Sequence, residues 1–291
     1  MYDRLIPEVI RTFSAPGEIE RTFLERVREA DIRLTRGFRT NGPVPSDRYA
    51  DPSLRAAYLL RYLGHYSLQL GDVLSALKDT RAEPVLAREE LRLVALCGGP
   101  CPEAIALAAL HQQAGGRRLE VDVLDRNAAH WADCWPISSA IAHAYPEHPE
   151  VRIRGLAIDL LQPGLSAAER ERLGRVHVFT AMNCLNELIG LGAARVHAGL
   201  ESRLAALPSG TLVLASDQAN YTDCEKGLQL LHGLLLERRT VILLAELNKA
   251  GAHHACNGFD EPKRISWMYG PENRNRFRKH TYQIRLAALL R

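Results

Sequence analysis

The stretch that decides the fold is Leu91-Arg92-Leu93-Val94-Ala95-Leu96-Cys97-Gly98-Gly99-Pro100-Cys101-Pro102-Glu103. The run from Leu91 to Cys97 has the length and apolar composition of a buried strand, and the glycine pair marks a turn. Glycines at such a turn let the backbone approach a ligand closely, because no Cβ stands in the way. The helix predicted from Pro102 to about Ala114 offers unpaired backbone N–H groups at its start. We therefore expect a strand, a ligand-binding turn and a helix.

A carboxylate follows at the end of the next predicted strand, Leu119 to Asp125. A carboxylate at the end of the strand after a glycine turn is placed to accept hydrogen bonds from the ribose hydroxyls of a nucleoside. Together, the glycine turn and Asp125 predict a nucleoside-containing cofactor. The alternative is that Asp125 only caps the helix that follows.

The turn also indicates which nucleoside is bound. Dinucleotide-binding turns usually read Gly-x-Gly-x-x-Gly, whereas the sixth position counted from Gly98 is Glu103. An acidic side chain repels a pyrophosphate, but it suits the cationic sulfonium and ammonium groups of S-adenosylmethionine. Charge complementarity therefore favours the methyl donor, with a nicotinamide-dependent oxidoreductase as the alternative.

The rest of the chain after residue 91 alternates short apolar runs with longer amphipathic ones, which predicts βαβ units and a parallel sheet. Helices are expected between the strands, the longest from about Leu185 to Leu207. The further strands are expected at Val151 to Leu156, His177 to Met182 and Thr211 to Ser216. Three strand-like segments follow, of which a closing antiparallel pair needs two: Val241 to Leu247, Ile265 to Tyr269 and Tyr282 to Leu290.

From about residue 91 to residue 291 the chain resembles the class I S-adenosylmethionine-dependent methyltransferases. Leu93 to Pro100 is similar to the glycine-rich first motif of that family, although Cys101-Pro102 departs from its usual third small residue. Ile158-Asp159-Leu160 is similar to the motif after the third strand, and Val178 to Asn183 to the motif of the fourth strand.

The resemblance implies an α/β fold, a seven-stranded mostly parallel Rossmann-like sheet with helices on both faces, and S-adenosylmethionine as the cofactor. It implies that the cofactor is bound by Cys97, Gly98, Gly99, Pro100, Asp125, Asp159, Leu160 and Asn183. We expect this domain to span residues 89–291, preceded by a helical N-terminal cap over residues 1–88.

Within the cap, Asp51-Pro52 is a helix-start signal, and apolar residues then recur at helical spacing along one helix, or two broken near Gly64. Tyr62 and Tyr66 lie in this stretch. We expect them near the mouth of the cleft as candidate substrate contacts, with core packing as the alternative.

Methyl transfer from a sulfonium is an in-line displacement that needs alignment, and it needs a general base only for a protonated acceptor. Residues after the fourth and fifth strands are placed to meet the acceptor. Candidate catalytic residues are Glu187, Tyr221 and His254, and candidate substrate contacts are Asp217 and Tyr221 besides the two tyrosines above. For Glu187, the alternative is that it only complements the helix dipole.

The cluster His253-His254-Ala255-Cys256 is expected to form a polar loop over the acceptor pocket that supplies a histidine base, with a loop of no special role as the alternative. No metal site is predicted, because adjacent histidines rarely both reach one ion and no Cys-x-x-Cys accompanies them.

Composition limits the class of partner. The 291 residues are 46% hydrophobic and 24% charged with a net charge of +3, as in an ordinary globular protein. No apolar run approaches the ~18 residues of a membrane span, and no signal pattern opens the chain, so we expect no membrane partner and a cytoplasmic location. The six cysteines are spread widely, which predicts packed thiols rather than disulfides.

The acceptor is expected to be a small molecule, because the net charge is low. The alternative is an RNA acceptor held by the basic end of the chain, residues 262–291, which has eight Lys or Arg against one acid, Glu272. A second alternative is a non-catalytic module that binds a nucleoside. The sequence does not indicate whether the protein is a monomer or an oligomer.

Overall fold

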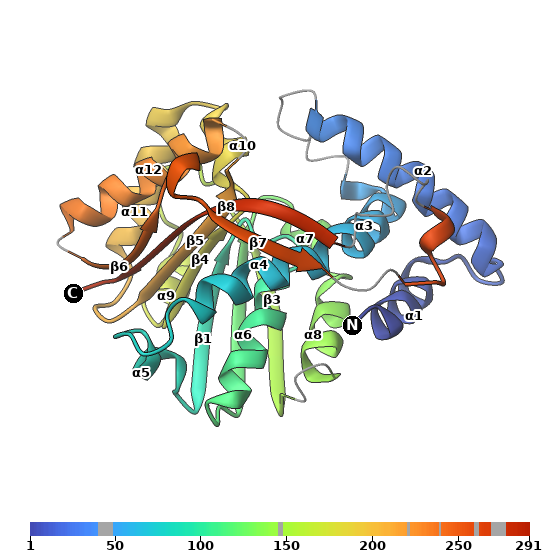
Figure 1. Ribbon diagram of the computed structural model, residues 1–291, viewed down its shortest axis with the longest axis horizontal. Helices are drawn as coiled ribbons and strands as arrows, with labels where there is room; N and C mark the ends of the chain where they lie inside the picture. The colour runs from blue at the N-terminus through green and yellow to red at the C-terminus, as the bar shows by residue number, and fades with distance from the viewer. Residues whose placement is uncertain (40–48, 145–147, 220–221, 239, 259–261, 269–277) are drawn as a thin grey trace.

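The computed structural model describes residues 1–39, 49–144, 148–219, 222–238, 240–258, 262–268 and 278–291. Its centre is a twisted sheet whose strand order is β3-β2-β1-β4-β5-β8-β6, with β7 paired to β8 (Figure 1). The strands are β1 (Glu90–Leu96), β2 (Arg118–Asp125), β3 (Glu150–Ala157), β4 (Val178–Met182), β5 (Leu212–Gln218), β6 (Val241–Glu246), β7 (His253–Gly258) and β8 (Arg278–Leu289).

The first five strands run parallel, and β8 is antiparallel to β5, β6 and β7. The parallel register pairs Leu96 with Leu124 on one side and with Ala181 on the other. The carboxyl ends of β1, β2, β4 and β5 therefore meet at one edge. The chain leaves β1 in one direction toward β3 and later in the other toward β5, and such a switch point is where open α/β sheets bind ligands.

Helices cover both faces of the sheet. On one face lie α4 (Gly64–Ser75), α6 (Pro102–Gln113) and α8 (Trp135–Ala144), which contact one another in that order. On the other face lie α9 (Ala167–Leu173), α11 (Ala193–Ala205) and α12 (Thr222–Glu237). Alternate residues of β1 separate the two cores, with Leu93 in the first and Val94 in the second, as the period of a strand requires. The predicted Rossmann-like sheet with helices on both faces is confirmed.

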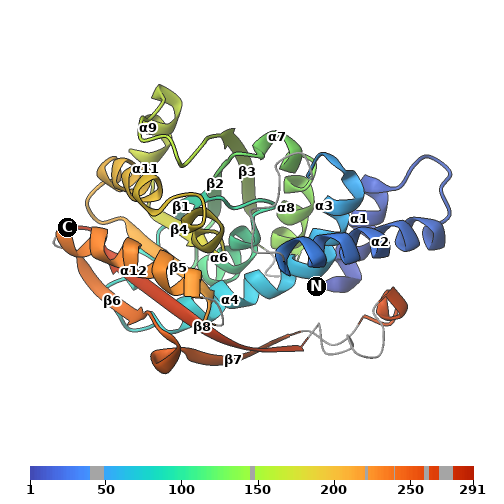
Figure 2. The ribbon, with the colours of Figure 1, turned by 90° about the horizontal axis from the view of Figure 1, so that it is seen from above.

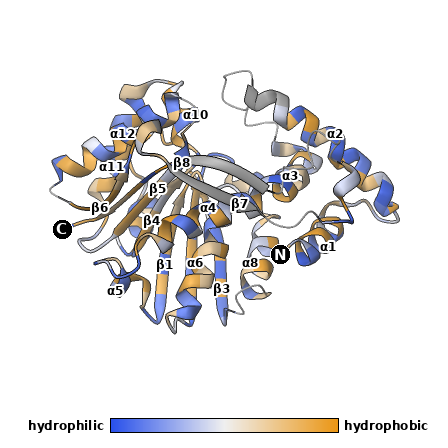
Figure 3. Cartoon of the chain, viewed as in Figure 1, coloured by the Kyte–Doolittle hydropathy of each residue, from blue (hydrophilic) through white to orange (hydrophobic). Residues whose placement is uncertain are grey.

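The segment before the sheet is helical, with α1 (Tyr2–Phe13), α2 (Glu20–Arg39), α3 (Pro52–Tyr58), a π-helical turn η2 (Leu59–Leu63), α4 and α5 (Glu83–Leu86). Figure 2 shows α1, α2 and α3 gathered at the end of the molecule opposite α12 and the C-terminus. The amphipathic α2 carries both hydrophilic and hydrophobic bands (Figure 3). Asp51 caps α3 as predicted, since its Oδ1 accepts a hydrogen bond of 2.8 Å from the Ser53 amide.

The break predicted near Gly64 is instead the π-helical turn η2, and Gly64 keeps right-handed helical angles. The long helix predicted from Leu185 to Leu207 is also divided, into α10 (Leu185–Ile189) and α11. The division falls at Gly192, whose φ of +130° is outside the helical region and is readily adopted only by glycine.

One prediction about the C-terminal part was wrong, because the expected loop at His253 to Cys256 is strand β7. Of the three strand-like segments, the one that begins at Ile265 is the extra one, since residues 266–268 form the short helix η4 (Ser266–Met268). Ile265 is fully buried, and its neighbours bind α2. Arg264 Nη2 lies 2.6 Å from Glu20 Oε2, and Arg21 stacks 3.5 Å above the Trp267 ring. The apolar residues of this segment therefore pack on the N-terminal helices rather than in the sheet.

The remaining short elements are α7 (Ala128–Trp131) and η3 (Lys249–Gly251). Over the described ranges, none of the helices combines the length and the apolar character that crossing a bilayer would require.

A histidine pair is buried where α6 ends beside the start of β3. His111 Nδ1 and His148 Nε2 lie 2.8 Å apart, and His111 Nε2 lies 2.6 Å from the Arg88 carbonyl oxygen. Burial lowers the pKa of His148 to about 4, with the neighbouring His111 and His143 adding to the effect, and burial also lowers the pKa of His111. Both rings are therefore neutral in the folded protein near neutral pH.

This pair predicts how stability depends on pH. Between the ordinary histidine pKa of 6.5 and the folded value of about 4 for His148, the unfolded chain binds protons that the folded chain does not. The contribution of this pair to the free energy of unfolding should therefore fall as pH falls through this window, by at most about 1.4 kcal/mol per pH unit for each histidine. Urea denaturation at pH 7.5 and pH 5 of the unaltered protein and of His148→Gln isolates this contribution from that of other titrating groups. The difference in unfolding free energy between the unaltered protein and His148→Gln should shrink from pH 7.5 to pH 5, whereas the difference for His197→Gln, on α11, should stay constant; a constant difference for His148→Gln would contradict the assignment.

Candidate functional site

The turn after β1 has an unusual backbone. Cys97, Gly99 and Cys101 have φ of 52°, 52° and 64°, so two cysteines occupy the left-handed region that normally favours glycine. The Cys101 amide donates a hydrogen bond of 2.7 Å to the Gly98 carbonyl, which closes the turn. A Cβ at Gly98 would lie only 2.8 Å from the Ala95 Cβ. Strained backbone of this kind gathers at ligand-binding sites, where the surrounding structure holds it in place.

Asp125 is bound directly to this turn. Its Oδ2 accepts a hydrogen bond of 3.0 Å from the Gly99 amide, and its Oδ1 accepts one of 2.6 Å from the Asn127 amide. The Cys97 amide donates to the Leu124 carbonyl at 2.7 Å, so the ends of β1 and β2 are joined by backbone as well. Burial raises the pKa of Asp125, and the two amide hydrogen bonds counteract part of that rise. The structure thus places the two predicted nucleoside-binding features side by side.

Glu103, in the first turn of α6, is 2% exposed, and its Oε2 has no hydrogen-bond partner among the described residues. Burial raises the pKa of Glu103 to about 8, and the charge of Asp125 contributes to the rise. A buried carboxyl that lacks a partner is costly unless a ligand satisfies it.

Asn183, at the end of β4, joins the sheet to α4. Its φ is 50°, its amide donates a hydrogen bond of 3.0 Å to the Ser216 carbonyl, and its Nδ2 donates to Gln69 Oε1 at 3.0 Å. Gln69 Nε2 in turn donates to Ser216 Oγ at 2.9 Å. The buried Asn183 Oδ1 has no partner among the described groups. Sequence reasoning missed Gln69; the available signal was a polar residue beside the apolar stripe of the helix.

Asp217 lies at the carboxyl end of β5, and Glu187 follows β4 on α10. Asp217 Oδ1 accepts hydrogen bonds from the Gln218 amide at 2.8 Å and the Cys224 thiol at 3.0 Å, while Oδ2 is buried without a partner in the described structure. Burial raises the pKa of Asp217 to about 6. The pKa of Glu187, on α10, rises to about 7 through burial first and then the charges of Asp217 and Asp125.

Glu103, Asp125, Glu187 and Asp217 therefore form an acidic cluster at the carboxyl ends of the strands. The neighbouring charges that act on Glu103 and Glu187 are carboxyls, and no cationic side chain of the described part of the chain is among them. Such a cluster is electrostatically suited to a positively charged ligand.

Aromatic rings lie beside the acidic cluster. We call Tyr58, Tyr62 and Tyr66 the tyrosine row, because their centroids are 5.0 Å and 5.3 Å apart in succession. Trp131 lies 5.2 Å from Tyr58 and is the nearest side chain to a Cβ built on Gly99, at 3.5 Å. Burial raises the pKa of Tyr66, and the charges of Asp217 and Glu187 add to this rise, so the row lies next to these carboxyls.

The π-helical turn aligns the row. In an ideal α-helix, residues eight apart point about 80° away from each other. The wider turn over Leu59–Leu63 rotates less per residue and brings Tyr58 and Tyr66 to a centroid distance of 6.5 Å. The sequence showed the tyrosines, but it contained no signal for this turn.

The other predicted site residues lie near the same edge or outside the described part. Asp159 follows β3, and its Oδ1 accepts a hydrogen bond of 3.0 Å from the Leu161 amide, while Leu160 is buried against α11. Tyr221 lies outside the described residues. His254 is on β7, paired with Tyr282 of β8, and its side chain is likewise outside the description. Within the described residues, no group of three or more His, Cys, Asp and Glu is arranged to hold a metal.

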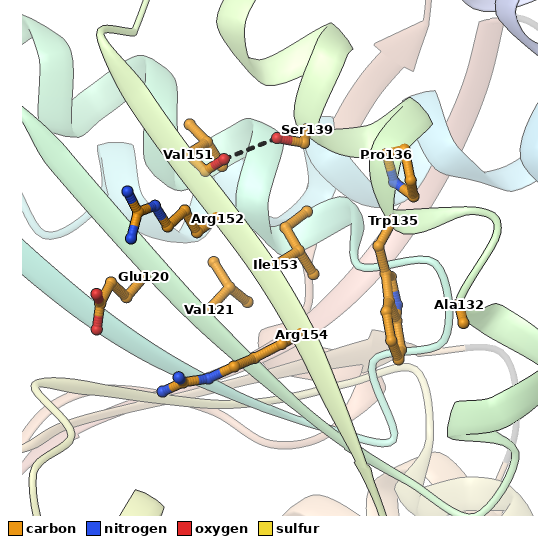
Figure 4. Close-up of a pocket in the computed structure, with 10 residues that line it drawn as sticks. All are labelled: Glu120, Val121, Ala132, Trp135, Pro136, Ser139, Val151, Arg152, Ile153 and Arg154. Atoms are coloured by element: carbon orange, nitrogen blue, oxygen red, sulfur yellow. Dashed lines mark hydrogen bonds between the residues drawn. The ribbon is translucent and has the colours of Figure 1, made fainter.

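A hollow of about 500 Å³ opens elsewhere, between α8 and the edge strand β3 (Figure 4). It is lined by residues of β2 and β3 that precede Asp125 and Ala157, among them Val121 and Ile153, and is separate from the acidic cluster. Trp135, which lines the hollow, links it to the turn, because its indole N–H donates a hydrogen bond of 3.0 Å to the Gly99 carbonyl.

A search for a matching family model and a search of curated proteins both find no match to the chain. Among solved structures, the chain is similar to an O-methyltransferase family protein from Burkholderia thailandensis, at 14% identity and a TM-score of 0.49 over 90% of this chain and 68% of that one. It is similar to the S-adenosylmethionine-dependent methyltransferase SibL, at 14% identity and a TM-score of 0.41 over 98% and 74%. It is also similar to a 16S rRNA (adenine(1408)-N(1))-methyltransferase from Catenulisporales acidiphilia, at 13% identity and a TM-score of 0.38 over 72% of this chain and 89% of that one. The fold assignment itself rests on the strand order and register.

The turn geometry predicts the effect of a single methyl group. In Gly98→Ala the new Cβ would press on Ala95, so the free energy of unfolding should fall by about 1–3 kcal/mol. Gly71→Ala is the matched control, because nothing lies within 4 Å of its Cβ on α4, and it should stabilise by up to about 1 kcal/mol. Chemical denaturation measures both. Equal effects of the two changes would contradict the close packing of the turn.

Proposed function

We propose that this protein is an S-adenosylmethionine-dependent methyltransferase that acts on a small-molecule acceptor. The observation that carries the proposal is the acidic cluster beside the glycine turn. A nucleoside site whose buried carboxyls have no cationic partner in the described structure suits a nucleoside that itself carries positive charge.

The residues of the edge fit this cofactor. Asp125 would accept the ribose hydroxyls, and the turn from Cys97 to Pro100 leaves room for the backbone to approach the nucleoside. Glu103 Oε2, Asn183 Oδ1 and Asp217 Oδ2 are buried acceptors in need of donors, and they suit the ammonium and sulfonium end. Asp159 and the Leu160 backbone follow β3, where an adenine would lie.

S-adenosylmethionine supplies an electrophilic methyl group and a good leaving group. What the chain must add is alignment and the exclusion of water. The bridge from Gln69 to Asn183 and Ser216 holds α4 against the ends of β4 and β5. The tyrosine row, on α3, η2 and α4, then forms a wall of the acceptor pocket, and the helices before the sheet act as a cap over it.

A small acceptor is favoured over RNA by charge. A polyanion would meet the acidic cluster, and RNA binding depends on cations that neutralise phosphates. The basic stretch that supports the RNA alternative is partly used inside the fold, since Arg264 pairs with Glu20 and the buried Arg285 pairs with Glu246 at 2.6 Å.

Thermal unfolding with added ligands tests the cofactor. S-adenosylhomocysteine should raise the melting temperature with the logarithm of its concentration, whereas NAD⁺ and NADP⁺ should leave it unchanged. Stabilisation by a dinucleotide alone would support an oxidoreductase instead. Methyl transfer to a panel of small metabolites, against none to bulk RNA, would separate an enzyme from a non-catalytic nucleoside-binding module.

Asp125→Ala should weaken S-adenosylhomocysteine at least tenfold, because a buried hydrogen bond to a charged group contributes about 1.5–3 kcal/mol. Isothermal titration calorimetry measures the loss. Asp223→Ala is the control, because that side chain pairs with Lys226 on α12. The affinity of this variant for S-adenosylhomocysteine should be unchanged. Equal affinity in both variants would remove Asp125 from the site.

A further inference from the structure

The acidic cluster and the tyrosine row lie close enough for their charges and phenols to interact. Asp217 and Glu187 act electrostatically on Tyr66, and Glu187 acts on Tyr58. The Tyr62 and Tyr66 rings are nearly parallel, at 21° and 5.3 Å, so the row presents aromatic surface close to two carboxyls.

Aromatic faces beside carboxylates are the chemistry by which proteins bind ammonium groups. The π face of an aromatic ring attracts a cation, and the interaction contributes about 2 kcal/mol or more where water is excluded. A carboxylate adds the attraction between opposite charges. We propose that the acceptor is an amine, bound as its ammonium ion between the tyrosine row and the carboxylates of Glu187 and Asp217, with Glu187 as the residue that takes its proton. This inference rests on the proposed methyltransferase function.

The charges around Glu187 support a cationic acceptor. Asp217 of β5 and Asp125 of β2 disfavour its ionised form, and the phenols of Tyr58 and Tyr66 lie close enough to feel its charge. Arg61 lies over the row, with its guanidinium carbon 5.3 Å from the centroid of the Tyr62 ring. It forms hydrogen bonds of 2.8 and 2.9 Å to both carboxylate oxygens of Asp31, so its charge is already balanced. A carboxylate or phosphate acceptor would therefore find repulsion here.

The proposed step balances in atoms and charge. Ionised Glu187 accepts a proton from R–NH₃⁺, which leaves R–NH₂ and a neutral carboxylic acid. The nitrogen lone pair then forms the N–C bond to the methyl group while the C–S bond breaks and its electron pair goes to sulfur. The products are R–NH₂–CH₃⁺ and S-adenosylhomocysteine. The burial-raised pKa of about 7 makes Glu187 a stronger base than an ordinary carboxylate and one that still ionises near neutral pH.

Two probes of equal shape test the inference on the full chain saturated with S-adenosylhomocysteine. Choline carries a quaternary ammonium, and 3,3-dimethylbutan-1-ol replaces its nitrogen with carbon. Calorimetry should show choline binding at least tenfold more tightly than the alcohol. Equal affinity, or tighter binding of the alcohol, would overturn the ammonium site and favour a neutral acceptor such as a phenol.

Variants locate the binding of choline. Tyr66→Leu and Glu187→Gln should each weaken choline at least fivefold, whereas Tyr66→Phe, which keeps the aromatic face, should stay within twofold. The affinity for S-adenosylhomocysteine should stay within threefold in the two Tyr66 variants. Unchanged choline binding in Glu187→Gln would overturn the inference even if Tyr66→Leu failed to fold. Loss of S-adenosylhomocysteine binding by the unaltered protein would instead refute the proposed function, and the two failures are thus distinct.

Methyl transfer gives the second readout. An arylalkyl amine such as 2-phenylethylamine should be methylated on nitrogen at least tenfold faster, by kcat/KM, than 4-ethylphenol. In Glu187→Gln the rate with the amine should fall at least tenfold and lose its rise with pH through about 7. Faster transfer to the phenol, or a pH profile that Glu187→Gln leaves unchanged, would overturn the assignment.

Discussion

The hydrogen bond from the Gly99 amide to the Asp125 carboxylate is the contact on which the site depends. It exists because β1 and β2 are parallel and in a register that ends Leu96 beside Leu124, so that a turn and a side chain from successive strands meet. The left-handed Gly99 in this turn donates its amide to that carboxylate. Around this contact the remaining carboxyls gather, since β4 and β5 end at the same edge. The strand register thus determines that the carboxyls gather at this edge of the sheet and make it acidic.

Much of this could be predicted from the sequence. The five parallel strands, the glycine turn and the position of Asp125 follow from periodicity and from residue types with few conformational alternatives. What escaped prediction depends on contacts between distant segments. The Ile265 region looks like a strand, but its apolar side chains are used against α2. The π-helical turn that aligns the tyrosines, and the partnership of Gln69 with Asn183, are products of packing that local composition does not encode.

Several carboxyls in one buried place make the ligand-free protein less stable than it otherwise would be. Burial raises the pKa values of Glu103, Asp125, Glu187 and Asp217, and their mutual repulsion raises that of Glu187 further. Natural sequences tolerate such conflicts where binding resolves them. The same carboxyls that oppose folding would hold a cationic ligand. The site therefore lowers the stability of the ligand-free protein and raises its affinity for that ligand.

The placement of β8 has a consequence for biosynthesis. This strand, the last element in the order of the chain, inserts between β5 and β6, while residues 262–268 reach back to α2. Neither the sheet nor the outer surface of α2 is complete until these late segments have left the ribosome. Contacts of such long sequence separation slow folding. During translation, the nascent chain would therefore expose the unpaired edges of β5 and β6, a period when it is open to chaperones and to aggregation.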